Sequence, residues 1–330
     1  MTRKLAGFIL VALGVLLSIY ILFPGLINME KSAKAEEERT ITGDFKRLSI
    51  TGQSTDVYVS ETSGDDILIR YVGKETLQVN EDEAANELRI EIDDDRRGWL
   101  TFGMFTRNKL YVSLPGRTME NTNIQTTSGH LSLADIDGGD VRASTTSGDL
   151  SLSVIDGENV MAGTNSGDIV VDRGTGETWD LKTSSGDIDV YTGDFSNLKT
   201  NTSSGETTLD QVAAETIGHH SSSGDLEGEL LQGELTVRTS SGEVEVNVQQ
   251  LNGNSSVQTS SGDVDWGVQE TPASAELNVN SGSGSIDVEG VEQWQTQLNE
   301  EHSFQATIGN NESSLKVTTG SGDIELWVNE

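Results

Sequence analysis

The chain has 330 residues, of which 54 are Asp or Glu and 21 are Lys or Arg, giving a formal charge of −33. Such an acidic chain repels the phosphate backbone of nucleic acids and anionic lipid surfaces alike, which excludes nucleic-acid binding. It contains no cysteine, which excludes disulfides, thiolate metal sites and cysteine nucleophiles. The 36 Gly, 3 Pro and 5% aromatic residues favour short strands joined by tight turns.

The first hydrophobic segment covers residues 5–23 and contains one polar residue, Ser18. At ~1.5 Å per residue, a helix of this length spans a bilayer. Arg3 and Lys4 precede it, so the positive-inside rule predicts a cytoplasmic N-terminus and an extracytoplasmic C-terminal part. Cleavage of a secretory signal after Ala35 is the alternative, although the segment is longer than the usual signal core. We expect an uncleaved, single-pass signal anchor in the cell membrane.

Four regions are predicted along the chain: a cytoplasmic tip and transmembrane anchor (1–24), a polar tether (25–40), an irregular N-terminal β region (41–115) and a repeat region (116–330). In the third region, alternating apolar residues predict half-buried strands. These strands are expected at 48–50, 57–59, 67–71, 77–79, 88–92 and 110–114.

Residues 93–108 break the alternation of the N-terminal β region. Apolar residues follow one another closely there, between basic residues on both sides: Trp99, Leu100, Phe102, Met104 and Phe105. One interpretation is a loop that covers the end of the β region as a cap. The other is an exposed loop that contacts a partner or the membrane, because exposed apolar patches often mark interaction sites. This loop is the sequence's best candidate contact region.

The phrase Ser-Gly-Asp-Ile returns, with small changes, from residue 128 to the end of the chain. Its glycines first recur every 19 residues, at Gly129, Gly148, Gly167, Gly186, Gly205 and Gly224. The step then varies through Gly242, Gly262 and Gly284 to Gly322, which leaves room for one degenerate copy before the last. A fixed period in the twenty-residue range indicates stacked structural repeats.

Each repeat reads as a strand, a Thr-Ser-Ser-Gly corner, and a second strand with apolar residues two apart, which share one face. The predicted inward pairs are Leu131/Leu133, Leu150/Leu152, Ile169/Val171, Ile188/Val190, Thr207/Leu209, Val244/Val246, Val264/Trp266, Ile286/Val288 and Ile324/Leu326. Nineteen residues are too few for a four-stranded propeller blade. The sequence therefore predicts an all-β parallel solenoid of eleven right-handed coils from Gly129 to Gly322.

Glycine is expected at the corner because it adopts positive φ without penalty. Second corners are expected near Gly138, Gly157, Gly176 and Gly233.

The iterated corners, introduced by residues 110–115 and by Thr127-Ser128-Gly129, resemble the bacterial adhesin-like family of unknown function called the toastrack β-solenoid. With the N-terminal anchor, the chain is similar to LiaG-type members from Gram-positive envelope-stress operons. The resemblance covers about residues 41–330. It implies an exported domain at the cell envelope with a role in adhesion or stress sensing, and it supplies no catalytic residues.

An acidic residue follows most corner glycines and should form a ladder if the coils stack in register. Its members are Asp149, Asp168, Asp187, Glu206, Asp225, Glu243, Asp263 and Asp323, with His130 and Ser285 as departures. One interpretation is that each carboxylate accepts hydrogen bonds at its own corner and faces water. The other is a row of weak Ca²⁺ or Mg²⁺ sites, because hard cations prefer oxygen ligands. The glycine-rich nonapeptide of calcium-binding β-rolls is absent, so no metal or other cofactor is predicted.

No catalytic constellation stands out in the sequence. The four histidines, His130, His219, His220 and His302, have no metal-ligand or triad spacing. Trp179 and Trp294 near second corners suggest either capping or sugar stacking, and Trp327 is expected to cover the terminal coil.

The sequence thus predicts a non-catalytic, membrane-anchored, extracytoplasmic protein that acts as an adhesin or an envelope-stress accessory. Its expected partners are the membrane through its N-terminal helix and either envelope-stress membrane proteins or a cell-wall polymer. The alternatives are an enzyme that acts on cell-wall polysaccharide and a passive surface spacer.

Overall fold

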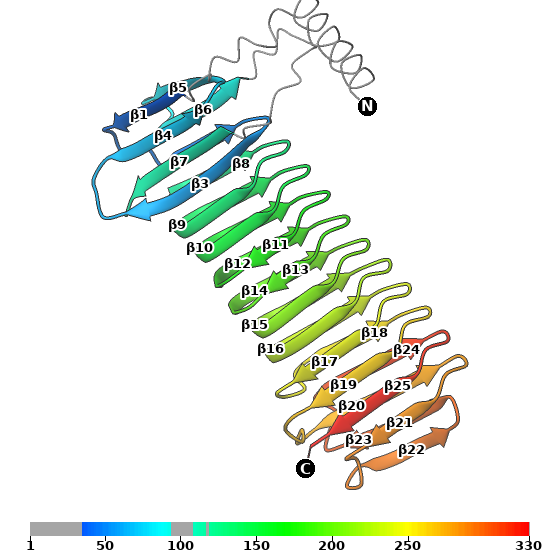
Figure 1. Cartoon of the computed structure of the whole chain (residues 1–330). Coiled ribbons are helices and arrows are strands. Elements are labelled where there is room, and N and C mark those ends of the chain that lie inside the picture. Colours follow the sequence, from blue (N-terminus) through cyan, green and yellow to red (C-terminus); the bar gives the residue numbers. More distant parts are fainter. Residues whose placement is uncertain (1–34, 94–107, 117–118, 330) are drawn as a thin grey trace, which may run out of the picture. The chain divides into compact units, whose positions relative to one another are not determined.

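The structure, a computed structural model, describes residues 35–93, 108–116 and 119–329, and the described residues from Glu36 onward form one compact unit (Figure 1). The described residues form strands and contain no helix that is long and apolar enough to cross a membrane. The predicted anchor at 5–23 and the predicted contact loop, with Trp99, Leu100, Phe102, Met104 and Phe105, both lie outside the described residues.

The strands divide into an N-terminal, a central and a C-terminal group. The N-terminal strands are β1 (Ala35–Ile41), β2 (Arg47–Thr51), β3 (Thr55–Thr62), β4 (Ile67–Gly73), β5 (Thr76–Asp82), β6 (Glu87–Asp93), β7 (Asn108–Pro115) and β8 (Met119–Gln125). The central strands are β9 (Leu131–Ser144), β10 (Leu150–Gly163), β11 (Ile169–Val171), β12 (Gly174–Lys182), β13 (Ile188–Val190), β14 (Gly193–Asn201), β15 (Thr207–His220) and β16 (Leu226–Arg238). The C-terminal strands are β17 (Val244–Val248), β18 (Asn254–Gln258), β19 (Val264–Val268), β20 (Ala275–Ser281), β21 (Ile286–Glu289), β22 (Gln295–Glu300), β23 (Ser303–Ile308), β24 (Ser313–Thr319) and β25 (Ile324–Val328).

The central strands stack in parallel, each coil paired with the next at the repeat spacing. Leu150 pairs with Leu131 on one side and with Ile169 on the other, and Ile188 continues the column. The predicted inward residues from Leu131 to Trp266, and those of β25, are buried, while Ile286 and Val288 are partly buried. The structure adds one pair that the sequence pattern missed, Leu226 and Gly228 of β16, because a glycine stands at its second inward position. The periodic apolar residues therefore form one continuous core.

The coils do not stack in chain order at the C-terminal end, contrary to the sequence prediction. β19 pairs with β25, and β25 pairs in turn with β21, so the last coil of the sequence lies between two earlier ones. On the other side of the coil, β24 likewise lies between β18 and β20. Figure 1 shows this as red strands between yellow and orange ones.

The degenerate repeat expected between Gly284 and Gly322 is also absent. Residues 295–308 instead form the antiparallel hairpin β22–β23, and β23 pairs antiparallel with β20. The alternating apolar residues in this stretch therefore belong to a hairpin that extends the sheet beside β20, and not to another coil.

The N-terminal end has the same kind of insertion. The first coil, β2–β3, lies between β6–β7 on one side and β8–β9 on the other. Strands β4 and β5 then pair antiparallel with β7 and β6. All six strands predicted in this region are present. Thr55 and Asp56 occupy the corner glycine and acid positions of this first coil, because Val57 is in register with Leu131.

The corner glycines are required by close backbone approach, and the sequence argument from positive φ is wrong. None of the corner glycines adopts positive φ. A Cβ built at Gly186 would instead overlap the carbonyl oxygen of Gly167 in the coil before it. The same overlap recurs along the stack, from Gly148 to Gly322. Only a residue without a side chain lets neighbouring corners come this close.

The second corner does not depend on glycine in every coil. Positive φ occurs at two positions near it: Asp135, Val154 and Gln211 share the first, and Gly176 and Gly233, with values near 150°, share a second position further along the repeat. The first position is occupied by different residue types, which explains why its sequence signal is weak.

Candidate functional site

The acidic residues that follow the corner glycines do form a ladder. Where the residue in the preceding coil is an aspartate, its Oδ1 atom accepts the backbone N–H of the next acid: Asp168 to Asp149 (3.2 Å), Asp187 to Asp168 (3.0 Å), Glu206 to Asp187 (2.8 Å), Glu243 to Asp225 (2.8 Å) and Asp323 to Asp263 (2.8 Å). The prediction that each carboxylate bonds its own corner is therefore wrong for these rungs. Each aspartate instead ties two coils together.

The ladder extends beyond the members found in the sequence. The N–H of His130 donates to Asp56 Oδ1 (3.1 Å), and both the N–H and the hydroxyl of Ser285 donate to Asp323 Oδ1 (2.7 and 2.8 Å). Asp56 was missed because no glycine precedes it, although Asp56-Val57-Tyr58-Val59 has the acid and alternating apolar pattern of the other corners. In space the rungs run from Asp56 to Ser285.

Burial and mutual repulsion act on the carboxylates of this face. Burial, followed by the negative charges of neighbouring acids, raises the pKa of Glu206 and of Glu243. Burial likewise raises the pKa of Asp189 and Asp265, each of which lies two residues after the corner acid of its own coil. The pKa of Asp323 is lowered by its hydrogen bonds from Ser285. Burial and like charges therefore oppose ionisation of these four groups, whereas the two hydrogen bonds from Ser285 favour ionisation of Asp323.

This electrostatic arrangement predicts that the carboxyl groups of this face add stability on acidification. A carboxyl group whose pKa is raised in the folded state binds its proton more tightly there than in the unfolded chain, so its contribution falls as pH rises through the folded pKa. Buried His219, whose pKa is about 4, acts in the opposite direction, so the prediction concerns the difference between two chains that both contain it. We expect the melting temperature of the wild-type chain, relative to that of the Glu206→Gln/Glu243→Gln variant, to rise by a few degrees between about pH 8 and about pH 5 in low salt. A difference that stays constant or falls on acidification contradicts the prediction.

The ladder does not assemble a metal centre among the described residues. No group of three His, Asp or Glu side chains in 35–93, 108–116 and 119–329 is arranged to hold a metal ion. In most rungs an aspartate Oδ1 already accepts a backbone N–H, so these carboxylates connect neighbouring coils of the stack.

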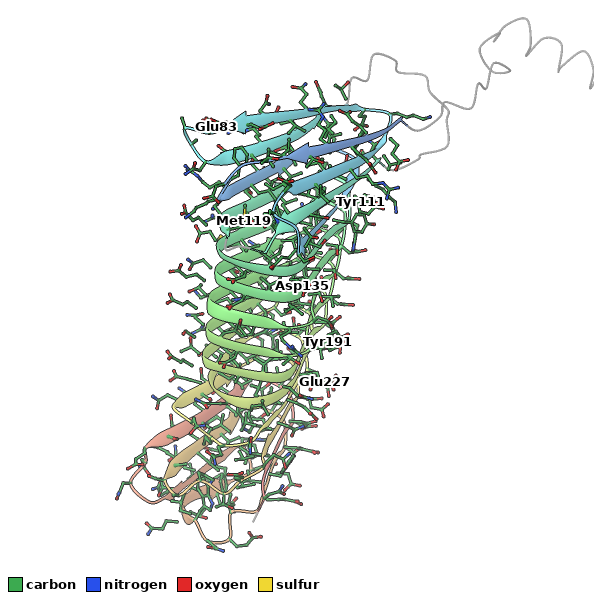
Figure 2. The ribbon with its side chains drawn as sticks, turned by 90° about the vertical axis from the view of Figure 1, so that its left-hand side faces the viewer. Glu83, Tyr111, Met119, Asp135, Tyr191 and Glu227 are labelled. Atoms are coloured by element: carbon green, nitrogen blue, oxygen red, sulfur yellow. The ribbon has the colours of Figure 1, made fainter. Side chains whose placement is uncertain are left out.

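The outward residues between the inward pairs form a second column on the same face. Register places Tyr111 beside Tyr58, Tyr58 beside Ser132, and the column continues through Ser151, Val170, Asp189, Thr208, Glu227, Glu245, Asp265 and Glu325 to Asp287. Figure 2 shows Tyr111, Tyr191 and Glu227 on one side of the stack. The column is aromatic near the N-terminal strands and acidic near the C-terminal ones.

The aromatic end of the column is the best-defined cluster of partly exposed side chains on it. The rings of Tyr58 and Tyr111 stack with centroids 4.9 Å apart and an interplanar angle of 14°. The Arg70 guanidinium lies 5.8 Å from the Tyr111 ring, and Lys109 Nζ lies 5.6 Å from the Tyr58 ring. His130 is tilted against Tyr58 at 6.3 Å. We call Tyr58, Tyr111, Arg70, Lys109 and His130 the tyrosine cluster.

Charge is distributed unevenly along the chain. Residues 118–330 contain 36 acidic and 6 basic residues, a net charge of −30, whereas residues 25–117, after the predicted anchor, contain 18 acidic and 13 basic residues, a net charge of −5. The tyrosine cluster therefore belongs to the part of the chain that repels an anionic ligand least.

The other candidates from the sequence are structural. His219 is buried, bonds Thr200 Oγ1 through Nδ1 (3.0 Å), and burial lowers its pKa to about 4. Trp179 and Trp294 are buried, which rules out sugar stacking on them. Trp327 lies over Gly267 of the adjacent coil rather than over a terminal coil.

One open depression brings carboxylates together. Glu61, Asp65 and Asp135 line it, together with Thr62, Ser63, Gly64, Pro115 and Gly116. No histidine lines it, and its acids come from the end of β3 (Glu61), the β3–β4 turn (Asp65) and the interior of β9 (Asp135).

These features define an all-β protein of stacked parallel coils with hydrogen-bonded corner ladders. The chain belongs to the family described as Toastrack DUF4097, whose pattern matches residues 45–206 and 194–327. The family resemblance noted in the sequence is thereby confirmed.

Several solved structures are similar to this chain. A candidate lipid-binding protein from Parabacteroides distasonis is 14% identical over 88% of this chain and 96% of its own, with a TM-score of 0.44. A candidate adhesin from the same organism is 12% identical over 89% and 97%, with a TM-score of 0.43. A candidate adhesin from Bacteroides fragilis is 12% identical over 90% and 98%, with a TM-score of 0.33. No curated protein matches the sequence.

Proposed function

We propose that this chain is a non-catalytic, adhesin-like binding protein of the cell envelope, held in the membrane by residues 5–23 with its C-terminal part outside. The hydrophobic segment and the preceding Arg3 and Lys4 support this location. Protease added to intact cells should then degrade residues 36–330 while leaving cytoplasmic proteins intact. Protection of this part would contradict the location, and a mature N-terminus at Glu36 would show that the signal is cleaved.

The observation that carries the binding role is the tyrosine cluster. Polar groups at the corners are used between coils, whereas Tyr58 and Tyr111 lie half-buried on an outward column with two cations beside their rings. Tyrosine and arginine are the residues most enriched where binding energy concentrates. The partner class that fits best is a cell-wall polymer carrying hydroxyl and anionic groups, because phenol and ammonium groups donate hydrogen bonds to both. The Arg70 guanidinium is already paired with Glu36 at 2.7 Å, so Lys109 supplies the cation of the cluster that we expect to contact the polymer.

The binding role is tested with the full chain in detergent and purified cell-wall polymer. We expect saturable binding without release of soluble fragments. The Tyr58→Ala/Tyr111→Ala variant should weaken binding about tenfold, as expected for removal of central aromatic contacts. Tyr191→Ala is the matched control, because Tyr191 is 45% exposed but lies away from the cluster.

The opposite result identifies the enzyme alternative. Release of fragments that stops in a Glu61→Gln/Asp135→Asn variant would assign polysaccharide cleavage to the open depression. Absence of both binding and release, with the fold intact, would leave the passive spacer as the function.

A further inference from the structure

The last coil of the sequence, β24–β25, holds the C-terminal end of the stack together. Among the described strands, β20 is in register only with β23 and β24, and β21 only with β25. β22 is in register only with β23. The whole segment from β20 to β23 is therefore attached to β18–β19 through β24–β25 (Figure 1).

The inserted coil continues the corner ladders on both of its sides. On the side of β18–β19, Thr319 Oγ1 donates to the Gly262 carbonyl (3.1 Å) and the Asp323 N–H donates to Asp263 Oδ1 (2.8 Å). On the side of β20–β21, Ser281 Oγ donates to the Gly322 carbonyl (2.9 Å) and the Ser285 N–H donates to Asp323 Oδ1 (2.7 Å). Without β24–β25, two facing strand edges would present these groups unpaired.

One side chain makes this position specific for its own coil. The Trp327 ring occupies the space over Gly267, where a Cβ would overlap the ring. In register, Trp327 lies between Gly267 of β19 and Glu289 of β21. Asn247 of β17 lies beyond Gly267 in the same row. No other described coil combines a tryptophan at this position with a glycine in the strand beside it. The gap is therefore fitted to residues 313–328 and not to an arbitrary repeat.

The inserted coil is also placed so that it can leave and return. A four-residue connection, residues 309–312, joins it to β23, with Gly309 and Asn311 at positive φ. Ser274 Oγ accepts the N–H groups of Asn310 and Glu312 (2.8 and 3.0 Å). All the pairings of β24–β25 are the same whichever copy of the chain supplies it, and such exchange is a low-cost route to dimers.

We propose that β24–β25 is an exchangeable closing coil: the gap between β18–β19 and β20–β21 accepts the corresponding coil of a second copy, and two chains join by reciprocal exchange. The partner of this surface is therefore the chain itself. An adhesin-like protein would gain a way to link copies that does not use the tyrosine cluster.

The absence of native cysteine allows a direct test in the full chain, purified in detergent. Asp265 and Glu325 are partners in register on adjacent strands, and both point outward between buried neighbours. Asp265→Cys and Glu325→Cys chains are mixed, unfolded and refolded together, and then oxidised. Exchange brings the two cysteines within bridging distance, so the mixed disulfide dimer should exceed that of a mismatched pair by about tenfold or more.

The mismatched pair is Asp265→Cys with Glu227→Cys, which lies on the same outward column two coils away. The Asp265→Cys/Glu325→Cys double variant, oxidised at high dilution, must form the intrachain disulfide and so shows that the refolded coil is inserted. With that control satisfied, equal dimer yields from the matched and mismatched mixtures overturn the proposal. A matched excess that disappears in a Trp327→Ala background supports the proposed fit over Gly267.

Discussion

Replacing Gly186 by alanine is expected to destabilise the domain by about 3 kcal/mol or more, because overpacking a site bounded by backbone cannot be relieved by a side-chain rotation. A Cβ at this position would overlap the Gly167 carbonyl oxygen and approach Asp168 Oδ1 to 2.9 Å. Both atoms belong to hydrogen-bonded rungs, so the neighbouring corner must move away and lengthen several bonds between coils. Urea or thermal unfolding of the purified full chain measures the loss.

Gly163→Ala is the matched control for this substitution. Gly163 lies in β10 of the same stack, has no positive φ, and a Cβ there would meet only the Lys182 carbonyl oxygen at 3.8 Å. Its replacement should be neutral or stabilising by up to about 1 kcal/mol, because alanine restricts the unfolded chain. If both substitutions have the same effect, close approach at the corners is not the reason for glycine there.

Replacing Thr183 by valine is expected to cost about 2–4 kcal/mol, because two buried backbone groups lose their partner. The Thr183 hydroxyl donates to the Gly167 carbonyl (3.0 Å) and accepts the Gly186 N–H (3.1 Å), while the side chain is only 2% exposed. Valine keeps the shape of threonine and removes both bonds. The change in unfolding free energy of the full chain reports the cost.

Thr183→Ser separates the hydroxyl from the methyl group. Ser221 and Ser281 already occupy the same position in other coils, where their Oγ atoms accept the N–H groups of Gly224 (2.6 Å) and Gly284 (2.7 Å). Serine should therefore retain most of the stability and lose only about 1 kcal/mol for one buried methyl group. A serine variant as unstable as the valine variant would show that packing, and not the hydroxyl, holds the corner.

The repeat and its inward residues could be read from the sequence because they are local and periodic. Ile169 and Ile188 stand at the same place in consecutive repeats, so their pairing follows from the period alone. Asp56 was missed because its corner has Thr55 in place of glycine. That departure is tolerated because the residue in register with Thr55 in β7 is Asn108, so no further corner glycine lies on that side.

The roles of the corner residues could be predicted only in part. The pattern of glycine followed by an acid indicated a turn and a column of carboxylates, both of which the structure contains. It did not indicate that Asp149 bonds the N–H of Asp168, because that contact depends on how closely two coils approach. The same is true of Gly186, whose backbone conformation is ordinary and whose neighbour is what excludes a side chain.

The sequence by itself determined the strands, the core-facing residues and the corner phrase, because alternation and period are properties of neighbouring residues. Only the tertiary structure decided the order of the coils at both ends. Any coil with the corner phrase can pair with any other, so sequence order does not say which sheet edge is free when β24–β25 or β2–β3 forms. The pairing of distant strand edges and the fit of Trp327 over Gly267 made that choice, and these depend on contacts between residues far apart in the chain.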